Sequence, residues 1–109
     1  MSDIFISYAS ENRYFALQIE KRLKQFFNIW IDREVIEGGM DWKDAIEDGV
    51  VNCTVFIVII TPESNESDWV KRETLLAEQK DKLRIPILLD GDLPFHLLDL
   101  QYVDFQGDF

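Results

Sequence analysis

The sequence predicts an α/β fold: a flavodoxin-like, doubly wound parallel sheet of five strands in the order 2-1-3-4-5. Runs of strand-forming residues alternate along the 109-residue chain with segments of helical periodicity, which is the pattern of βαβ units. The run 54–60 (TVFIVII) is apolar on both faces, as expected of a central strand with helices on each side. The length suits one domain spanning residues 1–109, with no internal repeat or linker.

The strands are expected where β-branched, aliphatic and aromatic residues gather between polar or glycine-containing segments. They are residues 3–8, 27–31, 54–60, 83–89 and 101–105. Pro86 has no backbone N–H, so the fourth strand is expected near an edge of the sheet. No closing helix follows the fifth strand, so we expect a domain that is trimmed or that continues into another segment of a longer protein.

The helices are expected at residues 13–25, 42–50 and 67–79. The first carries apolar residues on one side and cations near its end, where they suit the helix dipole. The second is expected to close near Gly49. In the third, Ser67 is a candidate N-cap. The polar segments 9–12 and 61–66 are expected to be loops, and Gly38-Gly39 indicates a turn within residues 32–41.

Glu73 interrupts the apolar stripe of the third helix. On a 3.6-residue period its position joins the apolar pair 69–70 to the apolar pair 76–77, where another apolar residue is expected. A carboxylate there is costly unless it is paired, protonated or at the mouth of a cleft. Two interpretations are open. Glu73 lies at the edge of the stripe, bound to Lys71, Lys80 or solvent, or it is a working carboxylate with Trp69 in the wall of a pocket.

The predicted topology favours the second interpretation. In a doubly wound sheet, ligands bind beyond the carboxyl ends of the strands, at the switch point between strands one and three. Those ends carry residues 8–12 and 61–68, and the helix that holds Glu73 begins at the same rim. Tyr8 and Ser10 are candidate ligand contacts by this position alone, and Tyr8 is equally suited to the core.

Composition and charge exclude several classes of function. The formal net charge of −10, from 21 acidic and 11 basic residues, argues against nucleic acids and anionic membranes as partners. No apolar run is long enough to span a bilayer, and the N-terminus lacks the basic leader of a secretory signal. Cys53 is the only cysteine, so we expect a cytoplasmic protein without disulfides. The only histidine, His96, is expected to be structural or solvent-facing.

Other familiar sites are not indicated. The acidic residues between 32 and 48 are expected to form a solvated loop or partner surface, because their spacing is not that of a calcium-binding loop; we expect no metal. Neither GxGxxG nor GxxxxGK[ST] is present. A receiver domain of this winding carries paired aspartates after its first strand, where this chain has residues 7–10 (SYAS).

Four blocks of the sequence together resemble a known family. They are FISYAS followed by EN, IWIDREVIEGGMDW, VFIVIITPESNESDWVKRE and IPILLDG. In this order they are similar to a TIR (Toll/interleukin-1 receptor) domain, over residues Asp3 to about Phe105. The resemblance is closest to the bacterial type and to the animal NAD hydrolase of axon degeneration, which has a similar D-W-V-x-x-E segment.

The resemblance implies an activity and a set of site residues. The glutamate of the W-x-x-x-E segment is catalytic in enzymatic members and falls on Glu73, with NAD+ as substrate and no cofactor. The expected substrate contacts are Tyr8, Ser10, Arg33 and Trp69, although Trp69 is equally suited to anchoring its helix to the sheet. Arg13 and Arg33 are candidates for holding the pyrophosphate.

The resemblance also implies partners. Residues Asp32–Asp41 correspond to the loop through which TIR domains contact one another; its expected self-association residues are Asp32, Arg33, Glu34, Gly38 and Gly39. We expect activity to arise on self-association, a sensor or oligomerisation domain on the C-terminal side, and a role in signalling or antiviral defence. The alternative is a non-enzymatic adaptor that recruits other TIR domains. A nucleoside deoxyribosyltransferase-like enzyme fits the SYAS and DWVxxE blocks less well.

Overall fold

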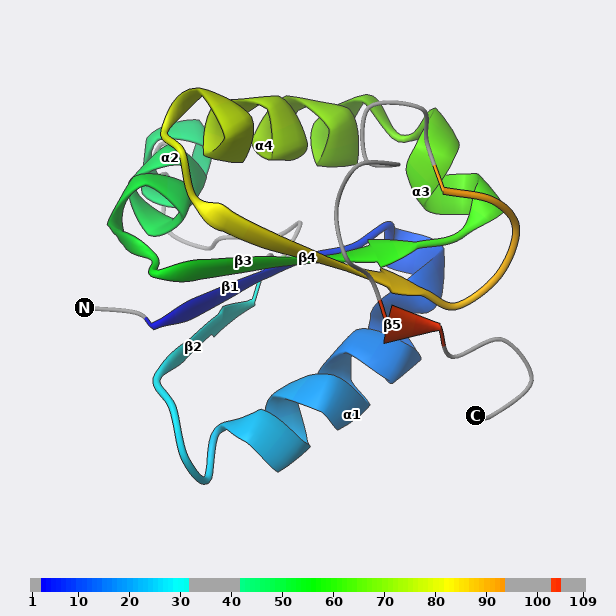
Figure 1. Ribbon diagram of the computed structural model, residues 1–109, viewed down its shortest axis with the longest axis horizontal. Helices are drawn as coiled ribbons and strands as arrows, with labels where there is room; N and C mark the ends of the chain where they lie inside the picture. The colour runs from blue at the N-terminus through cyan, green and yellow to red at the C-terminus, as the bar shows by residue number, and fades with distance from the viewer. Residues whose placement is uncertain (1–2, 32–41, 94–102, 105–109) are drawn as a thin grey trace.

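The computed structural model describes residues 3–31, 42–93 and 103–104, and the side chains of these residues except 42–46 and 104. The strands are β1 (Ile4–Ser7), β2 (Ile29–Ile31), β3 (Val55–Ile60), β4 (Leu83–Leu88) and β5 (Val103–Asp104). The helices are α1 (Arg13–Leu23), α2 (Trp42–Asn52), α3 (Pro62–Glu66) and α4 (Asp68–Gln79), with a 3-10 helix η1 (Ser10–Asn12). Helix α1 lies on one face of the sheet, and α2 and α4 lie on the other (Figure 1).

The sheet confirms the predicted winding. Its strands are parallel and follow the order β2-β1-β3-β4-β5, so the chain forms a flavodoxin-like α/β fold. Strand β1 is bonded to β2 on one side and to β3 on the other, which fixes its backbone inside the sheet. Pro86 is paired with Val58 of β3, whereas β5 pairs only with Ile87 and Leu88. Pro86 therefore has a ladder partner on one side in the described part of the sheet, as its missing N–H requires.

Alternation along the strands gives each face of the sheet its own core. Phe5, Phe56 and Val58 point toward α2 and α4, and the rings of Phe5 and Phe56 stack with centroids 5.6 Å apart. Ile4, Ile6 and Tyr8 point toward α1, together with Ile57 and Ile59 of β3. Successive side chains of a strand alternate between faces, so Ser7 shares the α4 side with Phe5.

Residues 61–66 form a short helix, α3, where the sequence pattern predicted a loop. Thr61 caps it: its Oγ1 accepts from the backbone N–H of Ser64 at 3.0 Å, and its own N–H donates to Ser64 Oγ at 2.8 Å. Pro62 occupies the first turn, where a missing N–H costs nothing. The polar residues 10–12 also form a helical turn, η1, instead of a loop. In the segment after β3, the polar side chains of Thr61 and Ser64 serve to cap α3.

Gly49 does not end its helix, contrary to the prediction. Helix α2 continues to Asn52, and Gly49 lies inside it with a buried position against the sheet. A Cβ at this position would lie 3.0 Å from ring atoms of both Phe5 and Trp30. The glycine is there because the helix axis approaches two stacked aromatic rings closely, not because the chain needs a left-handed turn.

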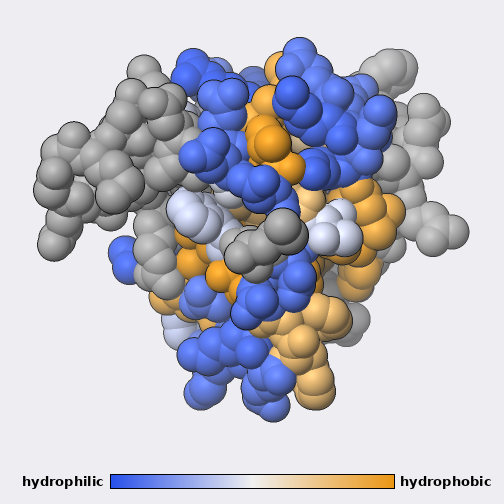
Figure 2. Space-filling model, turned by 90° about the vertical axis from the view of Figure 1, so that its left-hand side faces the viewer, coloured by the Kyte–Doolittle hydropathy of each residue, from blue (hydrophilic) through white to orange (hydrophobic). Residues whose placement is uncertain are grey.

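Where both sides of an element end are described, the other ends differ from the prediction by at most two residues, which is the usual uncertainty of helix and strand boundaries. At the end of the molecule where the strands begin, hydrophobic residues are exposed between hydrophilic ones (Figure 2). They include Phe26 and Phe27, after α1, and Leu83, the first residue of β4. The candidate site residues lie at the opposite end of the strands.

Candidate functional site

The switch point of the sheet lies between the carboxyl ends of β1 and β3. The chain leaves β1 through η1 toward α1 on one face and leaves β3 through α3 toward α4 on the other (Figure 1). Two adjacent strands whose connections diverge in this way open a space between the loops that follow them, and ligands of doubly wound folds bind there. The predicted rim is thus formed by residues of η1, α3 and the first turns of α4.

Glu73 lies on the inner face of α4. This helix begins at its N-cap Ser67, whose hydroxyl accepts from the backbone N–H of Val70, and Asp68 in its first turn suits the helix dipole. Its buried residues are Val70, Glu73, Thr74 and Ala77, and Glu73 is only 3% exposed. The burial of Glu73 contradicts the interpretation that its carboxylate is bound to solvent at the edge of the apolar stripe.

The Glu73 carboxylate is bonded to the end of the first strand. Ser7 Oγ donates a hydrogen bond of 2.7 Å to Glu73 Oε1, and Ser7 itself is fully buried. This length is typical of a hydroxyl that donates to a charged carboxylate. A carboxylate transferred from water to such a position costs several kcal/mol unless hydrogen bonds compensate (roughly 2–7 kcal/mol even for a neutral polar group). The bond to Ser7 is one such compensation.

Ser7 is a site residue that was not predicted from the sequence. The signal was present, because Ser7 is the only hydroxyl residue in the otherwise apolar run IFIS and alternates onto the same face as Phe5. A polar residue on the covered face of a central strand needs a partner on the helix above it. Identifying that partner as Glu73 requires knowing that α4 crosses the end of β1, which the three-dimensional fold supplies.

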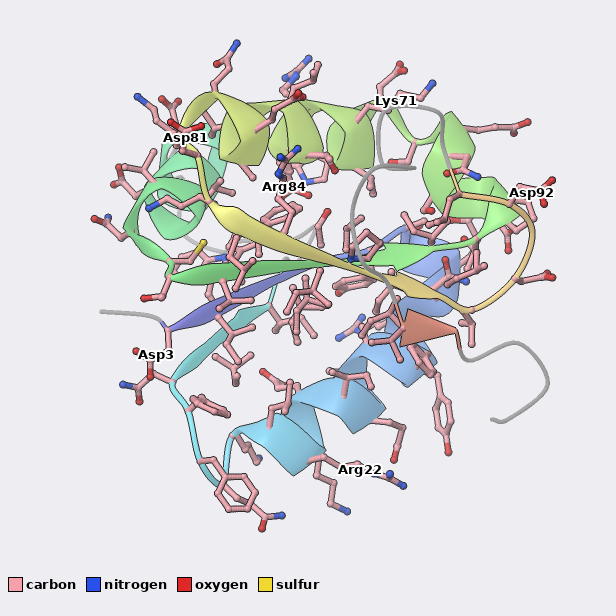
Figure 3. The ribbon with its side chains drawn as sticks, in the orientation of Figure 1. Asp3, Arg22, Lys71, Asp81, Arg84 and Asp92 are labelled. Atoms are coloured by element: carbon pink, nitrogen blue, oxygen red, sulfur yellow. The ribbon has the colours of Figure 1, made fainter. Side chains whose placement is uncertain are left out.

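Further hydrogen bonds fasten the rim around this pair. Thr61 Oγ1 donates to Asn12 Oδ1 at 2.7 Å and so connects the end of β3 to the start of α1. Asn65 Nδ2 donates to the backbone carbonyl of Asp92 at 3.0 Å, which connects α3 to the turn after β4; Figure 3 shows Asp92 beside α3. The connections after β1, β3 and β4 are thus held together at one edge of the sheet.

The structure also places the other predicted contacts near β1. Tyr8 is 6% exposed and belongs to the core on the α1 side, so the sheet separates its side chain from the α4 face that holds Ser7 and Glu73. Ser10 is exposed at the first position of η1 and donates to Glu11 Oε1 at 3.2 Å. Arg13 is exposed at the first residue of α1, at the same edge of the sheet.

Trp69 lies one helical turn before Glu73. Its indole is half-buried and packs against the core on the α4 side, and the guanidinium carbon of Arg72 is 5.8 Å from the ring centroid. This distance is within the range of a cation–π contact. Trp69 therefore combines a packing role with a partly open ring beside the helix N-terminus. Arg72 was not anticipated from the sequence pattern.

Several predicted residues fall outside the part of the chain that the structure describes. These are Asp32, Arg33, Glu34, Gly38 and Gly39 of the expected self-association loop, with Asp41 and His96. Within residues 3–31, 42–93 and 103–104, no three His, Cys, Asp or Glu side chains gather in a way that could hold a metal ion. No described helix is both long enough and apolar enough to cross a membrane.

Known proteins share this arrangement of elements. The family model of the TIR domain matches residues 4–109, whereas functionally curated proteins give no significant match. The TIR domain of the Toll-related receptor TRR-2 from Hydra magnipapillata is similar at 20% identity and a TM-score of 0.86, covering 99% of this chain and 87% of that one. The TIR domains of the activated Roq1 resistosome are similar at 16% identity and a TM-score of 0.72, covering 84% and 60%.

A metazoan TIR-STING receptor from C. gigas, solved in complex with 2',3'-cGAMP, is 26% identical with a TM-score of 0.75. That match covers all of this chain and 36% of the receptor, so the chain spans little more than a third of it. The likenesses to TRR-2 and Roq1 concern the fold alone, and the family model covers nearly the whole sequence. The chain therefore belongs to the TIR domain family.

Proposed function

We propose that this TIR domain is an NAD+ glycohydrolase whose catalytic carboxylate is Glu73 and whose activity arises on self-association. The observation that supports the proposal most strongly is the position of Glu73. It is a buried carboxylate at the switch point of a doubly wound sheet, on the segment W-x-x-x-E that carries the catalytic glutamate in enzymatic TIR domains. An apolar residue there would pack against the sheet at lower cost, so the carboxylate has the character of a functional group.

The chemistry suits a single carboxylate. The bond between the nicotinamide nitrogen and ribose C1' breaks, and its electron pair returns to the pyridinium ring, which leaves as neutral nicotinamide. The ribose acquires oxocarbenium character, and a negative charge fixed beside it stabilises that charge in the transition state. Water then adds to C1' and releases a proton, which gives ADP-ribose; attack by an adenine nitrogen gives a cyclic isomer. Both outcomes use the same first step.

The burial of Glu73 bears on regulation. A carboxylate that is 3% exposed cannot meet a dinucleotide until the surrounding segments separate. An assembly that holds the domain in an opened arrangement therefore increases the fraction of protein that can bind NAD+. The apparent affinity for NAD+ rises in proportion to that fraction. We propose that contacts between TIR domains, through the segment Asp32–Asp41 with Gly38 and Gly39, supply this bias.

The similar receptor from C. gigas suggests the setting. In that protein, a TIR domain occurs in a receptor solved with 2',3'-cGAMP. We propose by analogy that this domain acts in signalling or antiviral defence inside the cell, downstream of a sensor or oligomerisation module that assembles several copies. NAD+ is the substrate, and the proposed chemistry requires no cofactor.

The test is nicotinamide release from NAD+ by protein that is concentrated or artificially clustered, measured by chromatography. The informative variant is Glu73→Gln, which preserves the shape of the side chain and an acceptor for Ser7. The matched control is Glu78→Gln, an exposed glutamate on the same helix. We expect release to fall at least about 100-fold in Glu73→Gln and to stay within about twofold of wild type in Glu78→Gln.

Each other outcome has a definite meaning. Equal release by wild type and Glu73→Gln would place the chemistry elsewhere or indicate a contaminating enzyme. No release by any protein, with assembly confirmed by light scattering, would refute the enzymatic proposal and favour an adaptor that recruits other TIR domains. If activity rises only in proportion to protein concentration, with no further increase on clustering, the role of self-association is refuted and the glycohydrolase activity is not.

A further inference from the structure

We propose that Ser7 is a positioning residue for Glu73: its buried hydroxyl holds the carboxylate in one orientation at the switch point. This inference rests on the proposed function for its consequence in catalysis. The hydrogen bond itself, 2.7 Å from Ser7 Oγ to Glu73 Oε1, joins residues 66 positions apart in the sequence. It connects the end of β1 directly to the helix that carries the proposed catalytic group.

Ser7 is suited to this role because its backbone cannot move independently. It is the last residue of β1 and is paired with Val58 of β3, while β2 is bonded to the other side of the same strand. The side chain is fully buried beside Phe5 and Val58, so the hydroxyl is held by packing. Rigid elements fix a functional side chain more accurately than loops do.

Glu73 needs such a partner. A glutamate side chain has three rotatable bonds, and α4 fixes only its backbone. A hydroxyl has one proton to donate, and here that proton goes to Oε1, which sets the carboxylate plane relative to the end of β1. The bond therefore orients the carboxylate relative to the end of β1.

The consequence for catalysis follows from preorganisation. A negative charge stabilises an oxocarbenium-like ribose only if it already points at C1' when the nicotinamide bond breaks, because reorientation during the reaction costs part of the benefit. Ser7 does not touch the substrate in this scheme. It acts through Glu73, so its removal should lower kcat and leave KM for NAD+ nearly unchanged.

The kinetic experiment uses the clustered 109-residue chain and three variants. Ser7→Ala removes the hydroxyl, and Ser7→Thr retains one. Thr74→Val is the matched control, because Thr74 is a neighbouring buried hydroxyl on α4 that donates to the backbone carbonyl of Val70 at 2.7 Å instead of to Glu73. We expect Ser7→Ala to lower kcat about 10- to 100-fold with KM changed less than about twofold. We expect Ser7→Thr to recover most of kcat, and Thr74→Val to keep kcat within about threefold of wild type.

A spectroscopic experiment tests the inference without any activity. In protein whose glutamates carry carbon-13 at the side-chain carboxyl carbon, each glutamate gives a resonance. The resonance that disappears in Glu73→Gln is assigned to Glu73. Loss of the donated hydrogen bond in Ser7→Ala should shift that resonance at constant pH, whereas Thr74→Val should leave it in place. If Ser7→Ala does not fold, Ser7→Cys supplies a side chain of similar size with a weaker donor, and an intermediate shift and kcat are expected.

The outcomes separate this inference from the proposed function. Active wild type with kcat unchanged in Ser7→Ala would overturn the positioning role and leave the glycohydrolase intact. Equal losses in Ser7→Ala and Thr74→Val would also overturn it, because a general loss of packing would then explain both. Inactive wild type would refute the glycohydrolase, and the carboxyl resonance would decide the positioning role: a shift supports it, and an unmoved resonance overturns it.

Discussion

Thr61 Oγ1 donates a hydrogen bond of 2.7 Å to Asn12 Oδ1, and the same oxygen accepts the backbone N–H of Ser64 at 3.0 Å. One hydroxyl therefore caps α3 and connects it to the segment that leads into α1. Thr61 is the residue that follows β3, and Asn12 closes η1 after β1, so the contact spans the switch point. The two loops that form the rim of the proposed site share this connection.

Thr61→Val removes both interactions while preserving the shape of the side chain. We expect it to lower the free energy of unfolding by about 1–3 kcal/mol, since it deletes an N-cap and leaves a buried amide without its acceptor. Asn12→Ala removes only the connection between the loops and should cost about 0.5–1.5 kcal/mol. Urea denaturation followed by circular dichroism measures both. An Asn12→Ala loss as large as that of Thr61→Val would contradict the capping role assigned to Thr61.

Gly49→Ala should destabilise the protein, although alanine is the better helix former. The added Cβ would lie 3.0 Å from Phe5 Cε2 and Trp30 Cε2, tighter than nine in ten real Cβ contacts. Phe5 is fully buried and its ring stacks on both Phe56 and Trp30, so it has little room to withdraw, and we expect a loss of about 1–3 kcal/mol in the free energy of unfolding. Asp48→Ala, at an exposed position of α2, is the control and should change stability by less than about 0.5 kcal/mol. A stabilised Gly49→Ala would show that α2 does not pack this closely.

Asp81→Gly should stabilise the protein. Asp81 has φ of 55° after the end of α4, with its N–H donated to Glu78 O and the N–H of Lys82 donated to Ala77 O. These bonds form the Schellman motif, whose left-handed position favours glycine. We expect a gain of about 0.5–1 kcal/mol for Asp81→Gly, partly offset by greater freedom of the unfolded chain. Asp81→Ala, which keeps a Cβ at the strained position, should give no gain; thermal unfolding of both variants would check the difference.

The sequence predicted the winding of this sheet because each strand carries its own local signal. The run 54–60 is apolar on both faces, and the segments around it have helical periodicity, so the order 2-1-3-4-5 follows from the connection rules. Helix α3 escaped prediction because five residues are too few for a periodicity. The available signal was the capping pair Thr61 and Ser64, with Pro62 at the first position of the helix.

The candidate site was predictable only in part. Glu73 was identifiable because a carboxylate breaks an apolar helical stripe, which is a local observation. Its partner Ser7 was not, because the pairing of residues 66 positions apart depends on where α4 crosses β1. The prediction for Gly49 was wrong for the same reason. A glycine near a helix end resembles a cap, and the aromatic rings that require it come from strands β1 and β2, which are distant in the sequence.

Trp69 offers a test of substrate binding that is independent of the chemical step. If the indole beside Arg72 stacks against a ring of NAD+, Trp69→Leu should raise KM about tenfold with little change in kcat, since aromatic stacking contributes about 0.5–1.5 kcal/mol. Trp69→Phe retains a ring and should restore most of the affinity. Initial rates of nicotinamide release by the clustered variants measure both constants. An unchanged KM in Trp69→Leu would assign Trp69 to packing alone.

Cys53 predicts a loss of stability at alkaline pH. Burial raises the pKa of the Cys53 thiol above its ordinary value, and this effect outweighs the opposing influence of Lys82 and of nearby backbone groups. In the folded protein, the thiol donates to Val50 O at 3.1 Å and stays protonated when the unfolded chain has already ionised. The unfolded state is therefore stabilised relative to the folded state as pH rises above about 8.5, the pKa of a free thiol.

The contribution of Cys53 is thus fully present below about pH 8.5 and is lost as pH rises through the folded-state pKa, with a slope of at most about 1.4 kcal/mol per pH unit. Cys53→Ala removes this titration and leaves the lysines and tyrosines, which also ionise in this range, in place. The difference in unfolding free energy between wild type and Cys53→Ala should be constant from pH 6 to about 8. Between about pH 8 and pH 10, wild type should lose stability relative to Cys53→Ala. Urea denaturation at each pH measures it, and a difference that stays constant to pH 10 would mean that the folded and unfolded thiols ionise alike.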